Sequence, residues 1–221
     1  MIWIKICGTT NLEDAQTAVE AGADAIGFVF AESPREITPS GAEEIIAKLP
    51  AGVEKIGVFV DEPAERMLEI AREIGLTGVQ LHGEESPSDV GALRKGASGA
   101  LRIVKAIRLN DTAAGSQLAI YGANRRLWPD AILLDSGTTG ARGGSGEKFK
   151  WEQWAGVAQQ LSDRLSVIVA GGLTPENVAG ALSTFSPWGV DVVSGVERSP
   201  GKKDPEKVRA FISAVRAVDK Q

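Results

Sequence analysis

The chain has 221 residues, of which 43% are hydrophobic and 24% charged, a composition typical of a globular domain. Its formal net charge of −5 argues against general affinity for nucleic acid, so an anionic ligand needs a local site. One cysteine cannot form an internal disulfide, and one histidine excludes a metal site built from several histidines. We therefore expect a single domain spanning residues 1–221 in the cytoplasm, with no membrane span and no signal peptide.

Short β-rich runs alternate with helical patterns along the chain. Eight such units indicate an α/β fold, a (β/α)8 TIM barrel. The alternative, a doubly wound open sheet, is less favoured because no Gly-rich dinucleotide fingerprint follows the first run. The expected strands are 2–7, 24–30, 54–60, 78–82, 102–107, 130–135, 166–171 and 189–194.

Capping residues mark the expected helix ends. Asn11 is placed to accept a hydrogen bond from an otherwise unpaired backbone N–H, and Gly22 suits a left-handed turn after that helix. Proline follows Ser86, Thr174 and Asp204, and its missing N–H costs nothing at a first helical position. We expect a helix to begin directly after each of these three residues.

Side-chain alternation predicts which residues enter the barrel. Ile2, Ile4 and Ile6 share one face of the first strand, and this apolar face should pack against the surrounding helices. Lys5 and Cys7 then point inward, with Cys7 nearer the carboxyl end of the strand.

A lysine inside the barrel needs an acidic partner, because an unpaired buried charge is costly. In the last strand Val190 and Val192 should face outward, which turns Asp191 inward beside the first strand. We therefore predict a Lys5–Asp191 ion pair inside the barrel. The same alternation turns Gln80, His82, Leu133 and Asp135 inward.

Cys7 and Asp135 end different strands at the carboxyl rim, where the active sites of such barrels lie. A thiolate is a competent base and a carboxylic acid a competent proton donor. The alternatives are a small buried apolar side chain for Cys7 and a loop cap for Asp135. Their shared position at the rim favours acid–base chemistry.

Glycine-rich segments follow the last three expected strands. Glycine lets the backbone approach an anion closely and exposes N–H donors, although tight turns favour it too. Phosphate in barrels frequently binds at the loops after strands seven and eight. The predicted phosphate-binding residues are Gly171, Gly172, Ser194 and Gly195, with Gly144, Ser145 and Gly146 folding over them.

Two other polar residues lie at the same rim. The guanidinium of Arg35 can hold a substrate carboxylate through two parallel hydrogen bonds; the alternative is a solvated surface charge. His82 is interpreted as a hydrogen-bonded packing residue that helps to shape the pocket.

Eight motifs follow one another in order through nearly the whole chain: "KICGTT", "GFVFAESPR", "IGVFV", "VQLHG", "LLDS", "GGSGEKFKW", "AGGLTPENV" and "GVDVVSGVE". Together they resemble the phosphoribosylanthranilate isomerase family of tryptophan biosynthesis. The resemblance implies a cofactor-free (β/α)8 barrel that converts N-(5-phosphoribosyl)anthranilate to 1-(2-carboxyphenylamino)-1-deoxyribulose 5-phosphate by an Amadori rearrangement. The expected partner is this small phosphorylated substrate, and the sequence leaves monomer and homodimer open.

The resemblance also implies roles for single residues. Cys7 would be the general base, Asp135 the general acid, and Arg35 the group that holds the anthranilate carboxylate. Two positions depart from the family pattern: Lys150 replaces a usual aspartate, and Val193 stands where serine or asparagine is common. By alternation Val193 faces the pocket, so its change is expected to alter contacts near the phosphate.

Lys5 is the expected source of thiolate stabilisation. A general acid must stay protonated and a thiol must ionise, although their ordinary pKa values, about 3.9 and about 8.5, favour the reverse. Lys5 lies two residues before Cys7 on the same face, so it supplies the compensating positive charge. Lys5→Met is therefore expected to move the alkaline limb of activity to higher pH.

Other functions stay open at this point. Another phosphosugar isomerase would use the strand-four histidine and strand-six carboxylate, but would give Cys7 and Arg35 no role. A non-catalytic barrel that senses a phosphorylated metabolite would keep the glycine loops and not need Cys7 or Asp135. A metal-dependent epimerase is disfavoured by the single histidine, and a substrate with two phosphates by the single clear cradle.

Overall fold

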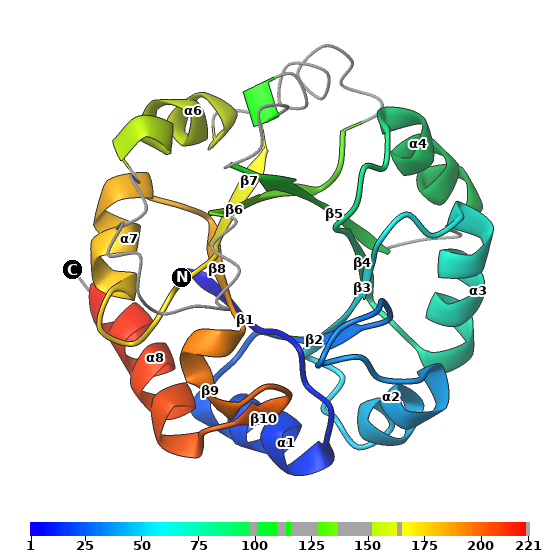
Figure 1. Ribbon diagram of the computed structural model, residues 1–221, viewed down its shortest axis with the longest axis horizontal. Helices are drawn as coiled ribbons and strands as arrows, with labels where there is room; N and C mark the ends of the chain where they lie inside the picture. Colours follow the sequence, from blue (N-terminus) through cyan, green and yellow to red (C-terminus); the bar gives the residue numbers. More distant parts are fainter. Residues whose placement is uncertain (98–100, 110–113, 116–127, 137–151, 163–164, 220–221) are drawn as a thin grey trace.

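The computed structural model describes residues 1–97, 101–109, 114–115, 128–136, 152–162 and 165–219. Eight parallel strands close into a barrel, with helices arranged around it (Figure 1). The predicted (β/α)8 barrel is confirmed, and each strand agrees with its predicted range to within two residues at either end. The strands are β1 (Trp3–Ile6), β2 (Ala25–Val29), β3 (Glu54–Phe59), β4 (Gly78–Leu81), β5 (Arg102–Arg108), β6 (Ala131–Asp135), β7 (Ser166–Ala170) and β8 (Gly189–Val192).

The barrel closes where β1 pairs with both β2 and β8. The register places Lys5 directly opposite Asp191 across the β1–β8 seam. An open sheet would leave two unpaired edges, so this pairing rules out the doubly wound alternative.

Several helices begin at a residue whose side chain caps the first turn. Asn11 Oδ1 accepts a hydrogen bond from the Asp14 backbone N–H at 2.9 Å, and Gly22 ends that helix with φ 102°. Asp204 caps the last helix as predicted. The helices are α1 (Leu12–Ala21), α2 (Pro39–Ile46), α3 (Ala64–Ile74), α4 (Pro87–Gly96), α6 (Glu152–Ser162), α7 (Val178–Phe185) and α8 (Pro205–Val218).

One predicted helix start is wrong. The helix after β7 begins at Val178, with Asn177 as its N-terminal cap, rather than directly after Thr174. Residues 175–177 form a turn in which Asn177 Oδ1 accepts the Thr174 backbone N–H at 2.8 Å. Thr174 Oγ1 still accepts the Glu176 backbone N–H at 3.3 Å, so the predicted cap closes this turn and the helix begins after it.

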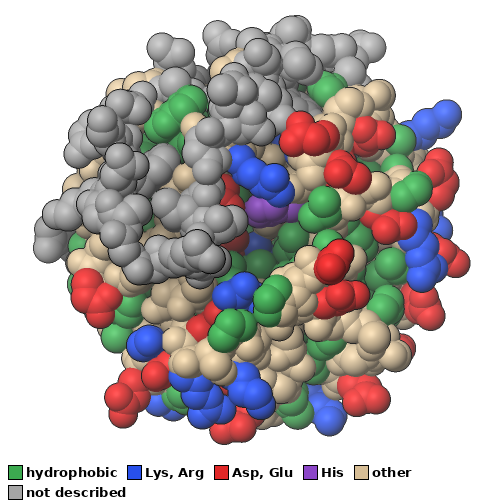
Figure 2. All heavy atoms as spheres, in the orientation of Figure 1, with side chains coloured by type: hydrophobic (Ala, Val, Ile, Leu, Met, Phe, Trp, Pro, Cys, Tyr) green, Lys and Arg blue, Asp and Glu red, His purple; other side chains and the backbone are tan. Residues whose placement is uncertain are grey.

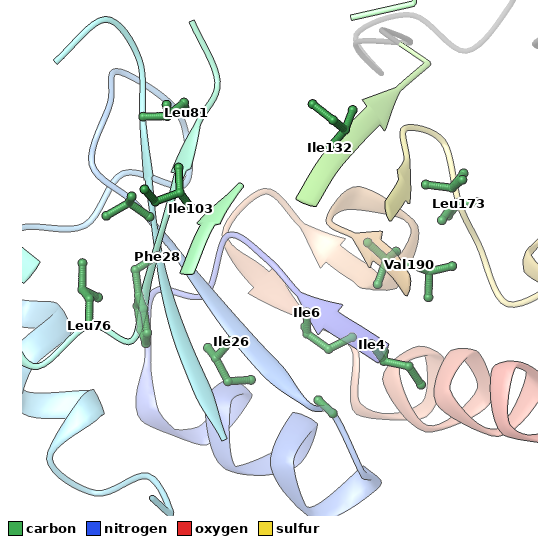
Figure 3. Packing of buried hydrophobic residues seen from close by; sticks show 14 of the residues in the cluster. Ile4, Ile6, Ile26, Phe28, Leu76, Leu81, Ile103, Ile132, Leu173 and Val190 are labelled. Atoms are coloured by element: carbon green, nitrogen blue, oxygen red, sulfur yellow. The ribbon is translucent and has the colours of Figure 1, made fainter. Parts of the chain in front are cut away.

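Two apolar layers divide the side chains of the strands. Ile4, Ile6 and Val190 belong to a large cluster between strands and helices, part of which is drawn in Figure 3. Trp3 and Leu133 belong to a smaller cluster inside the barrel. The predicted alternation is thus confirmed on both faces, and each buried aliphatic side chain contributes roughly 1.5–3 kcal/mol of transfer free energy.

A hairpin follows the last barrel strand. After the 3₁₀ turn η2 (Ser194–Val196), β9 (Glu197–Ser199) pairs with β10 (Lys202–Lys203) in antiparallel fashion, close to the start of α1 (Figure 1). Thr10 Oγ1 donates to the Gly201 carbonyl oxygen at 2.6 Å and ties the hairpin to the loop after β1. In the part of the chain covered by the structure, no helix has the length and apolar character to cross a membrane.

Candidate active site

The carboxyl ends of the strands bring the predicted acid and base to one mouth. Cys7 follows β1 directly and Asp135 is the last residue of β6. The Cys7 side chain is buried, and its backbone N–H bonds the Val192 carbonyl oxygen at 2.9 Å. Figure 2 shows the single histidine (purple) in a hollow near the middle of one face, with Lys and Arg side chains (blue) beside it. This face is therefore the carboxyl end of the barrel, because His82 directly follows the last residue of β4.

The predicted Lys5–Asp191 pair is confirmed. Lys5 Nζ lies 3.1 Å from Asp191 Oδ2, and both side chains are almost fully buried. A second acceptor, Gln80 Oε1, lies 2.6 Å from the same ammonium. These partners stabilise a charge that would otherwise be expensive inside the barrel.

Opposing influences act on the Cys7 thiol. Burial raises its pKa, and the Asp191 carboxylate raises it further, while Lys5 and Lys203 lower it without cancelling the rise. Both side chains lie against Gly27, so Lys5 is a neighbour of the thiol inside the barrel. For Lys5 itself burial lowers the pKa, but Asp191 and Cys7 outweigh it and hold the pKa above its usual value. The ammonium is therefore kept charged beside the sulfur.

A glycine makes room for these two side chains. Gly27 on β2 faces the barrel interior, and a Cβ there would lie 2.5 Å from Cys7 Sγ and 2.8 Å from Lys5 Cε. Any larger residue would displace the thiol or the ammonium. Gly27 lies in the "AIGFV" strand, where the absence of a side chain is the only sequence signal for this role.

Gln80 and His82 point inward, as predicted, and connect the interior to Asp135. Gln80 Nε2 lies 2.9 Å from His82 Nδ1, and His82 Nε2 lies 3.5 Å from Asp135 Oδ2. His82 was expected to be a hydrogen-bonded packing residue. The structure confirms the hydrogen bond and adds the contact with the predicted acid.

Arg35 lies at the mouth, but its guanidinium is paired within the protein. Its Nε contacts Glu197 Oε1 at 2.9 Å, and its Nη2 contacts Glu197 Oε2 at 2.7 Å. This fork-shaped pairing raises the pKa of Arg35. The alternative of a freely solvated surface charge is therefore wrong. Its Cδ would lie 2.7 Å from a Cβ on Gly8, so Arg35 packs directly over the residue after Cys7.

Lys203 is a buried residue of this site that sequence reasoning missed. Its Nζ donates to the Cys7 carbonyl oxygen at 2.6 Å and lies 3.1 Å from Glu197 Oε1. Burial lowers its pKa, and the carboxylate opposes that effect. Glu197 thus bridges Arg35 and Lys203. No pattern in the sequence marks a lysine in a two-residue strand outside the barrel as part of the mouth.

Arg108 is a second missed residue. It ends β5 beside Asp135 in the strand register, and its Nη2 donates to the His82 carbonyl oxygen at 3.2 Å. The predicted strand stopped one residue earlier, at 107. Extending the alternation by one residue would have turned Arg108 toward the mouth.

The predicted phosphate residues form adjoining loops after β7 and β8. Gly171 and Gly172 have φ of 84° and 65°, and a Cβ on Gly195 would lie 1.8 Å from the Leu173 carbonyl oxygen. The structure therefore brings Gly171, Gly172, Ser194 and Gly195 together at the carboxyl end of the barrel. The other predicted residues, Gly144, Ser145 and Gly146, and the departing Lys150 lie outside the described residues.

Val193 lies at the same end. Its Cγ1 would be 3.2 Å from a Cβ on Gly8, so the side chain packs beside the loop that follows Cys7. Its carbonyl oxygen faces Lys203 Nζ at 3.4 Å. The departure from the family pattern therefore changes an apolar contact next to the candidate base.

Metal binding has no ready site in the described ranges. Among those residues, no group of three or more His, Cys, Asp or Glu side chains is arranged to hold a metal ion.

A cavity lined by Trp128, Ser166 and Trp188 lies at the amino ends of β6 to β8, at the opposite end of the barrel from Cys7.

Comparisons with known proteins agree with this geometry. Residues 4–214 match the sequence model of the family described as N-(5'phosphoribosyl)anthranilate (PRA) isomerase. The N-(5'-phosphoribosyl)anthranilate isomerase of Rubrobacter xylanophilus is 43% identical over 218 residues, which are 98% of this chain and 100% of the relative.

Solved structures give the same answer. A phosphoribosyl anthranilate isomerase in complex with reduced 1-(o-carboxyphenylamino)-1-deoxyribulose 5-phosphate is 36% identical, with TM-score 0.81 and coverage of 98% of this chain and 100% of that chain. Monomers generated from the dimeric Thermotoga maritima isomerase are 37% identical, with TM-score 0.81 and the same coverage. The chain belongs to the N-(5'-phosphoribosyl)anthranilate isomerase family.

Proposed function

We propose that Cys7 is the general base and Asp135 the general acid in the reaction of this isomerase, the Amadori rearrangement of N-(5-phosphoribosyl)anthranilate. The observation that carries the proposal is the position of the Lys5 and Cys7 side chains, which lie together against Gly27 at the mouth that also holds Asp135. A positive charge close to a cysteine favours the thiolate, which is the form of cysteine that accepts a proton.

The proton transfers balance over one turnover. Asp135 gives its proton to the ribose ring oxygen as the C1–O bond breaks, and the nitrogen lone pair forms an iminium ion. The Cys7 thiolate takes the proton from C2, and the C–H electron pair forms the enolamine. The enol then loses its O–H proton and gains a proton at C1, which gives the ketone and restores acid and base. Each positioned proton transfer is typically worth about 10²–10⁴ in rate.

The two charged ends of the substrate have separate proposed partners. Arg35 would hold the anthranilate carboxylate, with Glu197 fixing the plane and direction of the guanidinium. The phosphate would bind at Gly171, Gly172, Ser194 and Gly195, and Gly144, Ser145 and Gly146 would complete this site. Backbone N–H groups in glycine loops suit a dianion because no side chain blocks the approach.

Location and assembly are proposed from the chemistry of the site and from the relatives. The reaction needs Cys7 as a thiol, and a reducing compartment such as the cytoplasm preserves it. The relative from Thermotoga maritima is dimeric. This chain would act as a monomer or homodimer, which light scattering of the purified protein distinguishes.

The roles of Cys7 and Asp135 are tested by the decay of phosphoribosylanthranilate fluorescence, with the substrate generated in situ. Cys7→Ala and Asp135→Ala should each lower kcat by about 10² or more. Glu44→Gln, on an exposed part of α2, should leave it unchanged. Wild-type turnover by a folded Cys7→Ala or Asp135→Ala protein would remove the corresponding role.

A further inference from the structure

A continuous chain of polar contacts runs from Lys5 to Asp135. Lys5 Nζ lies 2.6 Å from Gln80 Oε1, Gln80 Nε2 lies 2.9 Å from His82 Nδ1, and His82 Nε2 lies 3.5 Å from Asp135 Oδ2. The chain starts on β1, passes through β4 and ends on β6. Both Lys5 and Gln80 are 1% exposed, so neither can exchange its partner for water.

Each contact fixes the direction of the next. An ammonium only donates, so the amide atom that faces Lys5 must be the oxygen of Gln80. The amide nitrogen, which only donates, then faces His82 Nδ1. That ring nitrogen must accept the bond, so in a neutral imidazole the proton resides on Nε2.

The charge on Lys5 is itself secured. Asp191 lies on the other side of the ammonium at 3.1 Å, and it is held there by the β1–β8 register. The amide of Gln80 therefore cannot rotate by half a turn without placing its N–H groups against the ammonium. Arg108 donates to the backbone carbonyl oxygen of His82, whereas the ring contacts given by the described residues come from Gln80 and Asp135.

We propose that Gln80 is a positioning residue that fixes the neutral imidazole of His82 with its proton on Nε2, so that this N–H is donated to Asp135 Oδ2. The inference rests on the proposed role of Asp135 as general acid. The separation of 3.5 Å is long for a hydrogen bond, and such bonds commonly shorten when substrate binds.

This arrangement supports proton donation. When Asp135 gives up its proton, the N–H of His82 stabilises the carboxylate that remains. The opposite tautomer would aim a lone pair at that carboxylate and oppose the transfer. His82 would thus act through Asp135 and would not move a proton itself.

The single histidine makes the tautomer directly measurable. With ¹⁵N-labelled histidine, the folded protein gives one pair of ring-nitrogen signals, and the nitrogen without a proton resonates far downfield. At about pH 8.5, above the range in which histidine ordinarily protonates, wild type should show Nδ1 bare and Nε2 protonated. A protonated Nδ1 in wild type would overturn the proposal.

Gln80→Glu tests whether Gln80 sets the tautomer of His82. The new carboxylate has nearly the same shape as the amide but accepts hydrogen bonds from both Lys5 and His82. It should move the proton of His82 to Nδ1, reversing the two signals. Gln80→Met removes both contacts and should give a mixture of tautomers. Gln16→Glu, on the exposed side of α1, should keep the wild-type pattern. An unchanged pattern in both Gln80 variants would show that Gln80 does not set the tautomer.

Kinetics give a second, separate readout. Gln80→Glu should lower kcat by about 10- to 100-fold with a much smaller change in KM. Among replacements of His82, glutamine places an N–H near the Nε2 position and should retain more activity than asparagine, whose amide nitrogen lies nearer the Nδ1 position. The reverse order would contradict the proposal. The ring signals are read without substrate, so they report on Gln80 even if Asp135 proved not to be the acid.

Discussion

Lys203 Nζ donates a 2.6 Å hydrogen bond to the carbonyl oxygen of Cys7, although the two residues are 196 positions apart. The lysine comes from the hairpin after the barrel, and its side chain is fully buried. Because it also contacts Glu197, it joins the backbone of the proposed base to the carboxylate that holds Arg35. The hairpin is therefore part of the mouth.

Lys203→Met should lower both stability and activity. The buried Glu197 loses one of the two cationic partners that the described residues give it, and breaking a buried pair costs about 3 kcal/mol. The Cys7 carbonyl also loses its donor, so kcat should fall in the fraction that stays folded. Urea unfolding and steady-state kinetics measure the two effects. Lys202→Met, one residue away and exposed, is the matched control and should behave as wild type.

Lys5→Met and Asp191→Asn should shift the pKa of the Cys7 thiol in opposite directions. The Lys5 charge lowers the pKa of Cys7 and the Asp191 charge raises it. The first variant should therefore raise the pKa of Cys7 and the second should lower it. Because the protein has one cysteine, a single ¹³Cβ signal from labelled cysteine follows the titration directly. Shifts in the same direction would contradict this account of the site.

The activity profile of Lys5→Met follows from that shift. The ordinary pKa of a carboxylic acid lies below that of a thiol, so the alkaline limb of activity reports the base. Raising the pKa of Cys7 moves this limb to higher pH and lowers the plateau. The variant also leaves Asp191 unpaired, which costs about 3–5 kcal/mol. Lys5→Met combined with Asp191→Asn removes that charge and should recover part of the stability.

Glu197→Gln should reduce the loss of folding stability that occurs when the pH is lowered. Burial alone would raise the pKa of Glu197, but hydrogen bonds from Arg35 and Lys203 lower it below its usual value. A carboxylate with a lowered folded-state pKa stabilises the protein above the unfolded pKa of about 4.3. That contribution is lost as pH falls through the folded value.

Urea unfolding at about pH 7 and about pH 3.5, on either side of the ordinary glutamate pKa, measures this contribution. The difference between the two pH values should be smaller in Glu197→Gln than in wild type. Glu44→Gln, at an exposed position, should keep the wild-type difference. KM should also rise in Glu197→Gln, because Arg35 loses the carboxylate that orients it.

Gly171→Ala should displace the side chain of Asp135, the proposed general acid. Gly171 has φ 84°, and an added Cβ would lie 2.4 Å from Asp135 Oδ1 and 2.1 Å from Ser136 Oγ. The backbone strain alone costs about 1–2 kcal/mol, and Asp135 must move, so kcat should fall. Gly180→Ala in α7 meets open space and should stabilise the protein by about 0.5–1 kcal/mol. Equal effects of the two changes would refute the role of the close approach.

The sequence by itself determined the barrel and the inward set of residues. Alternation is a local property of an extended strand, so Ile4 and Ile6 outside the barrel require Lys5 and Cys7 inside it. Strand closure in a (β/α)8 barrel then brings Asp191 beside Lys5, and the 3.1 Å pair follows. Capping was also local, except where Asn177 replaced Thr174 at the start of α7.

Only the tertiary structure decided which polar groups meet at the mouth. Arg35 pairs with Glu197 across 162 positions, and Lys203 reaches Cys7 from a hairpin with no local signature. The direction of the Gln80 amide follows from a lysine on a different strand. Such contacts depend on the register between strands, the path of the loops and the rotamer of each side chain. A local pattern fixes which way a residue points, but not the partner it finds there.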